Sequence, residues 1–195
     1  MRMYQHFKNF FEEVLQPETD MERRLLRDSD FCEGLRWGQP RFGHPEGSIY
    51  KHIQEVLRNI DALGVEGLTR KRLRLVAFAH DTFKHKEKRS YPRDWSKHHG
   101  MLARRFMQRY TQDEAVLDLL ELHDEAFYAW RTKFLYGNPA AGELRLQRLL
   151  ERMGEHRQLF YLFFKCDTQT GDKHQEPLKW FEEKVEGIEL VPDLV

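Results

Sequence analysis

A helical run of apolar residues that ends in two ionisable side chains, His80 and Asp81, most constrains how this chain of 195 residues can fold. Residues 73–79, just before the doublet, are mostly apolar, which predicts a buried helix rather than a solvated one. Burying an unpaired carboxylate costs on the order of several kcal/mol, so both side chains need partners. A divalent cation would partner both, because imidazole and carboxylate are common metal ligands. A neutral core histidine beside a salt-bridged aspartate is the alternative, and the doublet alone leaves both open.

The spacing of the apolar side chains predicts an all-α fold. Ile49, His52, Ile53 and Val56 share one helical stripe, and the same three- and four-residue steps recur through most of the chain. No segment alternates between apolar and polar residues over the length of a strand. We therefore predict a single domain of about eight helices over 1–195, which include continuous helices over 21–33, 95–110 and 113–130.

Composition narrows the class of protein. Lys+Arg and Asp+Glu are both 32, so a strongly basic nucleic-acid-binding surface is not indicated. The two cysteines, Cys32 and Cys166, form neither a zinc-finger spacing nor a disulfide framework, which fits a reducing cytosol. Acidic residues interrupt the opening 15 residues, unlike a signal peptide, and no apolar run reaches the roughly 20 residues of a membrane span. We expect a cytoplasmic protein that does not enter a membrane.

Further ionisable residues lie on apolar stripes or at helix ends elsewhere in the chain. Taken singly, each is more simply a satisfied core histidine or a helix-end aspartate. Together, one site lined by several helices in the middle of a bundle explains them better, since each would otherwise be buried at a cost. These positions are His52, His80 with Asp81, His98 or His99, His123, and Asp167.

The order His…His-Asp…His…His…Asp resembles the HD superfamily of metal-dependent phosphohydrolases over roughly residues 43–167. The resemblance implies an HD-type bundle with its core at about 43–170, onto which N-terminal helices within 4–35 and a C-terminal helix at 177–186 pack. It implies that a divalent metal is bound by His52, His80, Asp81 and Asp167. It also implies a second metal or phosphate site, with His99, His98 and His123 as candidates.

Two segments refine this resemblance. Lys84 matches the lysine that usually follows the doublet, although Thr82-Phe83 stands where the family has Ile-Gly. Residues 43–52 are similar to the opening of the HD domain in bacterial tRNA nucleotidyltransferases. Because the sequence holds no counterpart of the nucleotidyltransferase head domain, the resemblance implies phosphohydrolase chemistry rather than CCA addition.

The chemistry of such a site follows from the cation. A divalent ion lowers the pKa of water from about 15.7 towards ~7 and so provides a nucleophile for phosphorus. Asp81 is expected to act as ligand and proton acceptor, and Lys84, one turn on, to reach a phosphate oxygen. Mixed His and carboxylate ligands suit Mn, Fe, Co, Ni or Zn better than Ca. The sequence does not choose among these and Mg, or between one ion and two.

Other candidates carry weaker signals. His98 and His99 are adjacent, so only one is expected to face the site from a helix, and His99 shares a face with Phe106. Arg131 is a candidate for binding a second phosphate, although a surface arginine beside a core tryptophan explains it more simply. Glu46 is expected either to hydrogen-bond its own loop or to line the pocket. The basic run 84–89 could attract an anionic substrate, but a solvated loop is the commoner explanation.

The sequence therefore predicts a metal-dependent phosphohydrolase that acts on a small phosphate ester. The expected activity is that of a phosphomonoesterase or a cyclic phosphodiesterase, and the expected substrate is a nucleotide or a nucleic-acid end. A non-catalytic HD-like module that binds a nucleotide or a protein partner is the alternative. A purely structural helical adaptor is a weaker third reading.

Overall fold

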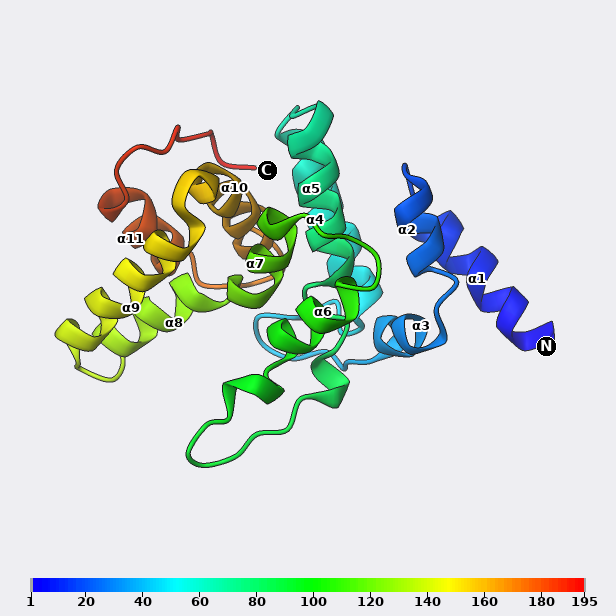
Figure 1. Cartoon of the computed structure of the whole chain (residues 1–195), viewed down its shortest axis with the longest axis horizontal. Coiled ribbons are helices and arrows are strands. Elements are labelled where there is room, and N and C mark those ends of the chain that lie inside the picture. Colours follow the sequence, from blue (N-terminus) through cyan, green and yellow to red (C-terminus); the bar gives the residue numbers. More distant parts are fainter. Residues whose placement is uncertain (1, 195) are drawn as a thin grey trace.

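The computed structural model describes the chain from residue 2 to residue 194, and its side chains from residue 9 onward (Figure 1). Phe7, expected on the first apolar stripe, therefore lies outside the described side chains. Within these limits the chain forms eleven α-helices and three 3₁₀ helices. They are α1 (Arg2–Leu15), α2 (Asp20–Leu25), α3 (Ser29–Arg36), α4 (Ile49–Ala62), α5 (Gly67–Ala79), η1 (Lys84–Lys86), η2 (Trp95–Lys97), α6 (His99–Met107), α7 (Glu114–Leu122), α8 (Glu125–Phe134), α9 (Pro139–Met153), η3 (Gly154–His156), α10 (Arg157–Thr168) and α11 (Glu176–Lys184).

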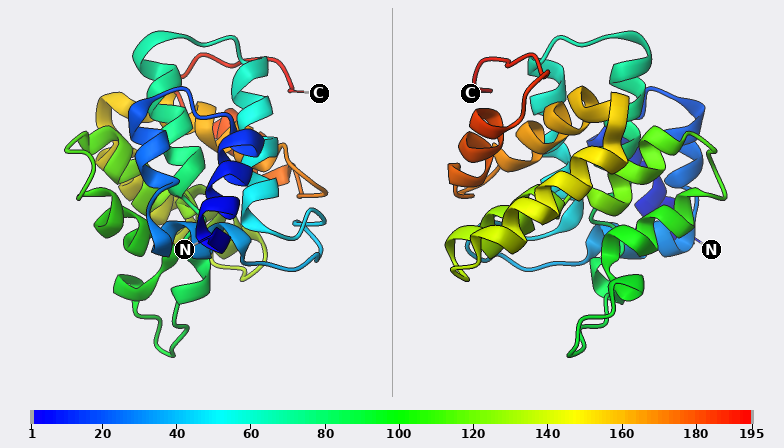
Figure 2. Two further views of the ribbon diagram at one scale, coloured as in Figure 1. Left: turned by 90° about the vertical axis from the view of Figure 1, so that its right-hand side faces the viewer. Right: turned by 60° about the vertical axis from the view of Figure 1, so that its left-hand side comes forward.

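The predicted all-α class is confirmed. Between residues 2 and 194 the only bridge of β type is an isolated pair, Arg41 with His44. Helices α4 and α5 lie side by side at the centre, with α1–α3 on one side and α8, α9 and α11 on the other (Figure 1). Figure 2 shows α8 and α9 running alongside each other. One apolar core joins these parts, because buried residues from α1 to α11 form a single cluster.

The α-helices outnumber the predicted eight mainly because two expected helices are each split into two, while a third expected helix is shortened. The helix expected over 21–33 stops after Leu25, and Asp28 then caps α3 by accepting hydrogen bonds from two backbone amides. The helix expected over 95–110 begins only at His99, and the one expected over 113–130 breaks at residues 123–124. The last two interruptions coincide with candidate site residues.

Gly100 allows the start of α6 to pack closely against the end of α7. A Cβ on Gly100 would lie 2.8 Å from the carbonyl oxygens of both Leu120 and Glu121. The first turn of α6 thus rests directly on the last turn of α7, at a distance that only glycine permits. This contact places the start of α6 beside the end of α7.

A buried ion pair ties the N-terminal helices to the centre. Glu22 of α2 is fully buried and Arg74 of α5 is 3 % exposed, and Arg74 Nε donates a hydrogen bond of 3.0 Å to Glu22 Oε1. None of the helices between residues 2 and 194 has the length and apolarity of a membrane span.

Candidate metal centre

Two His-Asp doublets lie at the ends of two packed helices. His80 and Asp81 follow α5 directly, and His123 and Asp124 follow α7 in the same way. Helices α5 and α7 contact each other, and the rings of His80 and His123 are 5.2 Å apart, centroid to centroid. The carbonyl end of a helix carries a partial negative charge. Two such ends meeting at one place favour a cation there.

Hydrogen bonds fix the orientation of the histidine rings. His80 Nδ1 donates to Ala77 O at 3.0 Å, and His123 Nδ1 donates to Leu120 O at 2.9 Å. His99 Nδ1 lies 2.5 Å from a carboxylate oxygen of Glu87. A ring that donates from Nδ1 presents its Nε2 lone pair on the other side, which is the usual arrangement of a metal-binding histidine.

The first donor group consists of His52, His80, Asp81 and Asp167. His52 Nε2 lies 2.8 Å from Asp167 Oδ1, 3.2 Å from His80 Nε2 and 3.8 Å from Asp81 Oδ2. His80 Nε2 lies 3.6 Å from the same Asp81 oxygen and 3.7 Å from Asp167 Oδ1. Two donors bound to one ion at about 2.1 Å are separated by about 3.0 Å at a right angle and about 3.4 Å in a tetrahedron. His52, His80 and Asp81 could therefore hold a metal ion, and Asp167 lies beside both histidines.

The second donor group uses the other oxygen of Asp81. Asp81 Oδ1 lies 3.4 Å from His99 Nε2 and 3.6 Å from His123 Nε2, and these two nitrogens are 3.2 Å apart. Asp124 Oδ2 lies 3.3 Å from His99 Nε2 and 3.7 Å from His123 Nε2. Asp81, His99 and His123 could hold a metal ion, and Asp124 lies beside both histidines. Each oxygen of Asp81 therefore faces a different donor group.

His98 and His99 both face the site, contrary to the expectation that only one would. The doublet stands at the very start of α6, where His98 is the N-cap and its Nδ1 accepts a hydrogen bond from the amide of Gly100. With Nδ1 as acceptor, the neutral His98 ring carries its proton on Nε2, which lies 3.1 Å from the Tyr128 hydroxyl and 3.4 Å from Asp124 Oδ2. His98 Nε2 thus donates to the Tyr128 hydroxyl, which in turn donates to Asp124 Oδ2, whereas His99 is a candidate ligand.

Two lysines compensate the buried carboxylates. Lys84 Nζ lies 2.5 Å from Asp81 Oδ2, and Lys173 Nζ lies 2.8 Å from Asp167 Oδ1. Burial alone raises the pKa of an aspartate, but these ammonium groups and the histidines hold the pKa of Asp81 and of Asp167 well below the usual value. The pKa of Asp124 is held low in the same way, chiefly by the charge of His123. The carboxylates are therefore ionised, as metal ligands must be.

Two of the histidines differ in their protonation. Burial lowers the pKa of His52 to about 4, with help from the charge of Lys173, so this ring is neutral and ready to bind a cation. Burial also lowers the pKa of His99, but its carboxylate neighbours, Asp124 first among them, outweigh burial and raise the pKa to about 10. A cation bound at His99 would therefore replace a proton.

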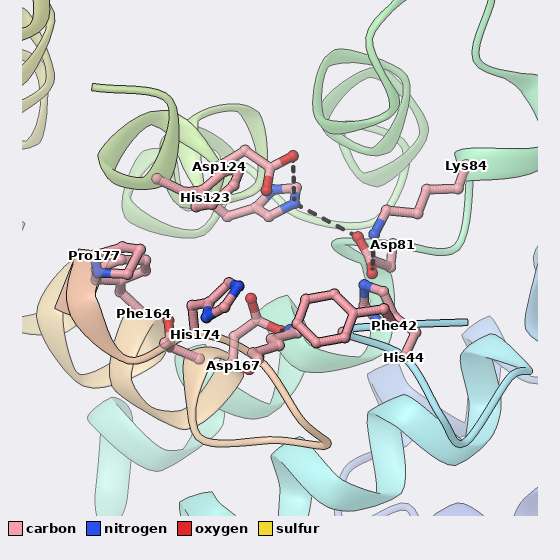
Figure 3. Close-up of a pocket in the computed structure, with 14 residues that line it drawn as sticks. Phe42, His44, Asp81, Lys84, His123, Asp124, Phe164, Asp167, His174 and Pro177 are labelled. Atoms are coloured by element: carbon pink, nitrogen blue, oxygen red, sulfur yellow. Dashed lines mark hydrogen bonds and ion pairs between the residues drawn. The ribbon is translucent and has the colours of Figure 1, made fainter. Parts of the chain in front are cut away.

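A cavity of about 260 Å³ opens beside the two donor groups (Figure 3). In Figure 3, Asp81 and Lys84 lie at one end, Phe164 and Pro177 lie at the other, and His123 and Asp124 lie across from Asp167. The charged part of the lining consists of Asp81, Lys84, His123, Asp124, Asp167 and Lys173. The apolar part consists of Phe42, Phe127, Phe164 and Pro177.

The two weaker candidates lie outside the cavity lining. Glu46 Oε1 lies 3.0 Å from His44 Nδ1 and 3.5 Å from His52 Nδ1, so Glu46 stands behind the histidines. The guanidinium of Arg131 lies over the ring of Tyr128, 4.7 Å from its centroid. Arg131 thus supports the residue whose hydroxyl donates to Asp124.

Several residues that the sequence prediction did not assign belong to the site. Asp124 follows His123 as Asp81 follows His80, and this repeated dipeptide was a signal that could have identified it. Glu87 lies in the segment expected to be a solvated loop, yet it holds His99. Lys173 and His44 sit in irregular segments, where periodicity carries no information.

Comparison of the chain with protein-family models, with curated proteins and with solved structures gave no match. The site is therefore interpreted from its own geometry.

Proposed function

We propose that this protein is a metal-dependent phosphohydrolase of the HD type, which cleaves a small phosphate ester, either a nucleotide or a nucleic-acid end. The observation that carries the proposal is Asp81, whose two oxygens face two histidine-containing donor groups beside a cavity that also holds Lys84 and Lys173. Carboxylates and histidines attract cations, and the lysines attract the phosphoryl group.

In this proposal the first cation is held by His52, His80, Asp81 and Asp167. The second is held by Asp81, His99, His123 and Asp124. A bound divalent cation would supply an activated water and would screen the charge of the phosphoryl oxygens. Both roles suit Mn, Fe, Co, Ni, Zn or Mg.

The residues of the chain perform the remaining tasks. Lys84 contacts Asp81 Oδ2, and its ammonium group becomes available to a phosphate oxygen once a cation takes over that carboxylate. Asp81 would join the two donor groups. His98 Nε2 donates to the Tyr128 hydroxyl, and that hydroxyl donates to Asp124 Oδ2, so the two residues together orient the carboxylate.

The experiment combines metal analysis with a substrate screen. Purified protein is assayed on phosphate monoesters and cyclic nucleotides with added Mn²⁺, Co²⁺, Ni²⁺ or Mg²⁺. We expect turnover that chelation removes. We also expect Lys84→Met to lower kcat by about 10²–10³, the cost of removing one charge-stabilising donor, without loss of bound metal. Lys88→Met, at an exposed position of the neighbouring loop, is the matched control. Metal-loaded protein that binds nucleotides without any turnover would instead identify a binding module.

A further inference from the structure

Two loops that are distant in the sequence form one wall of the cavity. They are residues 37–48, between α3 and α4, and residues 169–175, between α10 and α11. The amide of Gly43 donates a hydrogen bond of 2.6 Å to Asp172 Oδ1, and the rings of Phe42 and His174 are 5.2 Å apart. The amide of Gly171, at φ +55°, donates to Glu55 of α4 at 3.1 Å. The two loops thus hold each other and are anchored to α4.

This wall presents a cation and two rings to the cavity. Lys173, Phe42 and His174 all line it, and in Figure 3 Phe42 and His174 lie on the same side as Asp167. Phe42 is 67 % exposed, so its ring packs against little else in the chain. An exposed aromatic ring at the mouth of a charged cavity is suited to stack on a flat ring of a ligand.

Apolar residues next to this wall also line the cavity, so its lining suits a ligand with a charged part and an apolar part. Beyond the charged residues the lining is apolar, formed by Phe127, Phe164 and Pro177. A cavity of about 260 Å³ is just below the usual range of ligand pockets, roughly 300–1,000 Å³, and suits one compact ligand. The matching ligand has a dianionic phosphoryl head and a flat, partly apolar body.

We infer that Lys173, Phe42 and His174 determine specificity by selecting phosphate monoesters that carry a planar ring over aliphatic ones. This inference deepens the proposed function and rests on it for the identity of the head group. Lys173 binds the phosphoryl head, since its ammonium group lies at the Asp167 end of the first donor group. Phe42 and His174 hold the ring.

The test measures binding without turnover. Phenylphosphonate and methylphosphonate share the charged head and differ in the ring, and their C–P bond is not a phosphate ester. Each is titrated into full-length protein saturated with Mn²⁺. We expect the wild type to bind phenylphosphonate about tenfold more tightly, as one stacked ring contributes. Phe42→Ala and His174→Ala should each reduce this ratio towards one and leave the Kd of methylphosphonate unchanged.

Lys173→Met distinguishes the contribution of the phosphoryl head to binding from that of the ring. It should weaken both phosphonates about tenfold and leave their ratio unchanged, with metal content measured in parallel. The matched controls are Tyr91→Ala and Lys88→Met, which change an exposed aromatic ring and an exposed lysine on another loop and should alter neither Kd. Phe42→Leu also removes the ring but leaves a larger side chain than Phe42→Ala does. Circular dichroism confirms that each variant is helical.

The outcomes distinguish the two proposals. Equal affinity of the wild type for both phosphonates, no binding of either, or an unchanged ratio in both Phe42→Ala and Phe42→Leu would overturn the inference. A ring preference in a protein that hydrolyses no phosphate ester would support the inference about Phe42 and His174 and would contradict the proposed phosphohydrolase activity. Hydrolysis of phosphate esters with no ring preference would support the phosphohydrolase activity and would contradict the inference about Phe42 and His174.

Discussion

His80 and His123 occupy equivalent positions: each is the first residue after a buried helix, and each donates from Nδ1 to the carbonyl three residues earlier. Their Nε2 atoms face different oxygens of Asp81, at 3.6 Å in both cases. The two helix ends therefore present equivalent ligands on either side of one carboxylate.

This arrangement predicts how metal content divides. His52→Ala removes a ligand of the first group alone, and His123→Ala removes one of the second group alone, so each should lose roughly half of the bound metal. Asp81→Asn should lose most of it, because both groups share that carboxylate. Elemental analysis of the purified variants measures this, with His156→Ala, whose ring lies outside both groups, as control. Equal losses in all three site variants would argue against a shared carboxylate.

The different hydrogen bonds at the Nδ1 atoms of His98 and His99 predict different effects of substituting the two residues. His98→Asn keeps an acceptor for the amide of Gly100, because asparagine is a good N-cap, and should retain full metal content. His99→Asn removes a candidate ligand and should lower metal content at the second group. His98→Ala should cost about 1 kcal/mol of the free energy of unfolding, the value of an N-cap. Metal analysis and urea denaturation provide both readings, and metal loss in His98→Asn would show that His98 is itself a ligand.

The close contact at Gly100 predicts that adding one methyl group there would push α6 away from α7. Gly100→Ala should destabilise the fold by about 1–3 kcal/mol and deplete the second donor group, since the added Cβ pushes His99 away from His123.

Gly142→Ala is the matched control for this substitution. Its Cβ would lie 2.6 Å from Lys133 Cβ and 2.8 Å from Ala129 O, away from the site. It should therefore destabilise the protein to a similar extent with full metal content. Depletion of metal in both variants would mean that general destabilisation, rather than the α6–α7 contact, governs the site.

The Glu22–Arg74 pair predicts a large loss of stability that is independent of the site. Glu22→Ala leaves the buried Arg74 guanidinium with the exposed Glu18 carboxylate at 3.2 Å and the Gln16 carbonyl oxygen at 2.9 Å, and should cost about 3 kcal/mol. Asp20→Ala removes an exposed pair with Arg23 on the same helix and should cost about 0–1 kcal/mol. Urea denaturation compares the two, and similar small losses would contradict a structural role for the buried pair.

The helical class and most apolar stripes could be predicted from the sequence, because three- and four-residue spacing reports directly on which face of a helix is buried. The helix interruptions at residues 98 and 123–124 could not be predicted in this way. There, a side chain that caps a helix and a helix end that turns into a site override a continuous apolar pattern. The proximity of His52, His80, Asp81 and Asp167 was anticipated from their order. Glu87 and Lys173 were not, since their partners are set by tertiary contacts, and Asp124 was not assigned although its dipeptide with His123 repeats that of His80 and Asp81.

The first donor group joins residues from distant parts of the chain, with His52 Nε2 only 2.8 Å from Asp167 Oδ1. It can assemble only after α4 and α10 have docked, whereas the second group needs nothing beyond α8. Metal uptake at the first group would therefore be a late event in folding and a direct reporter of complete tertiary structure.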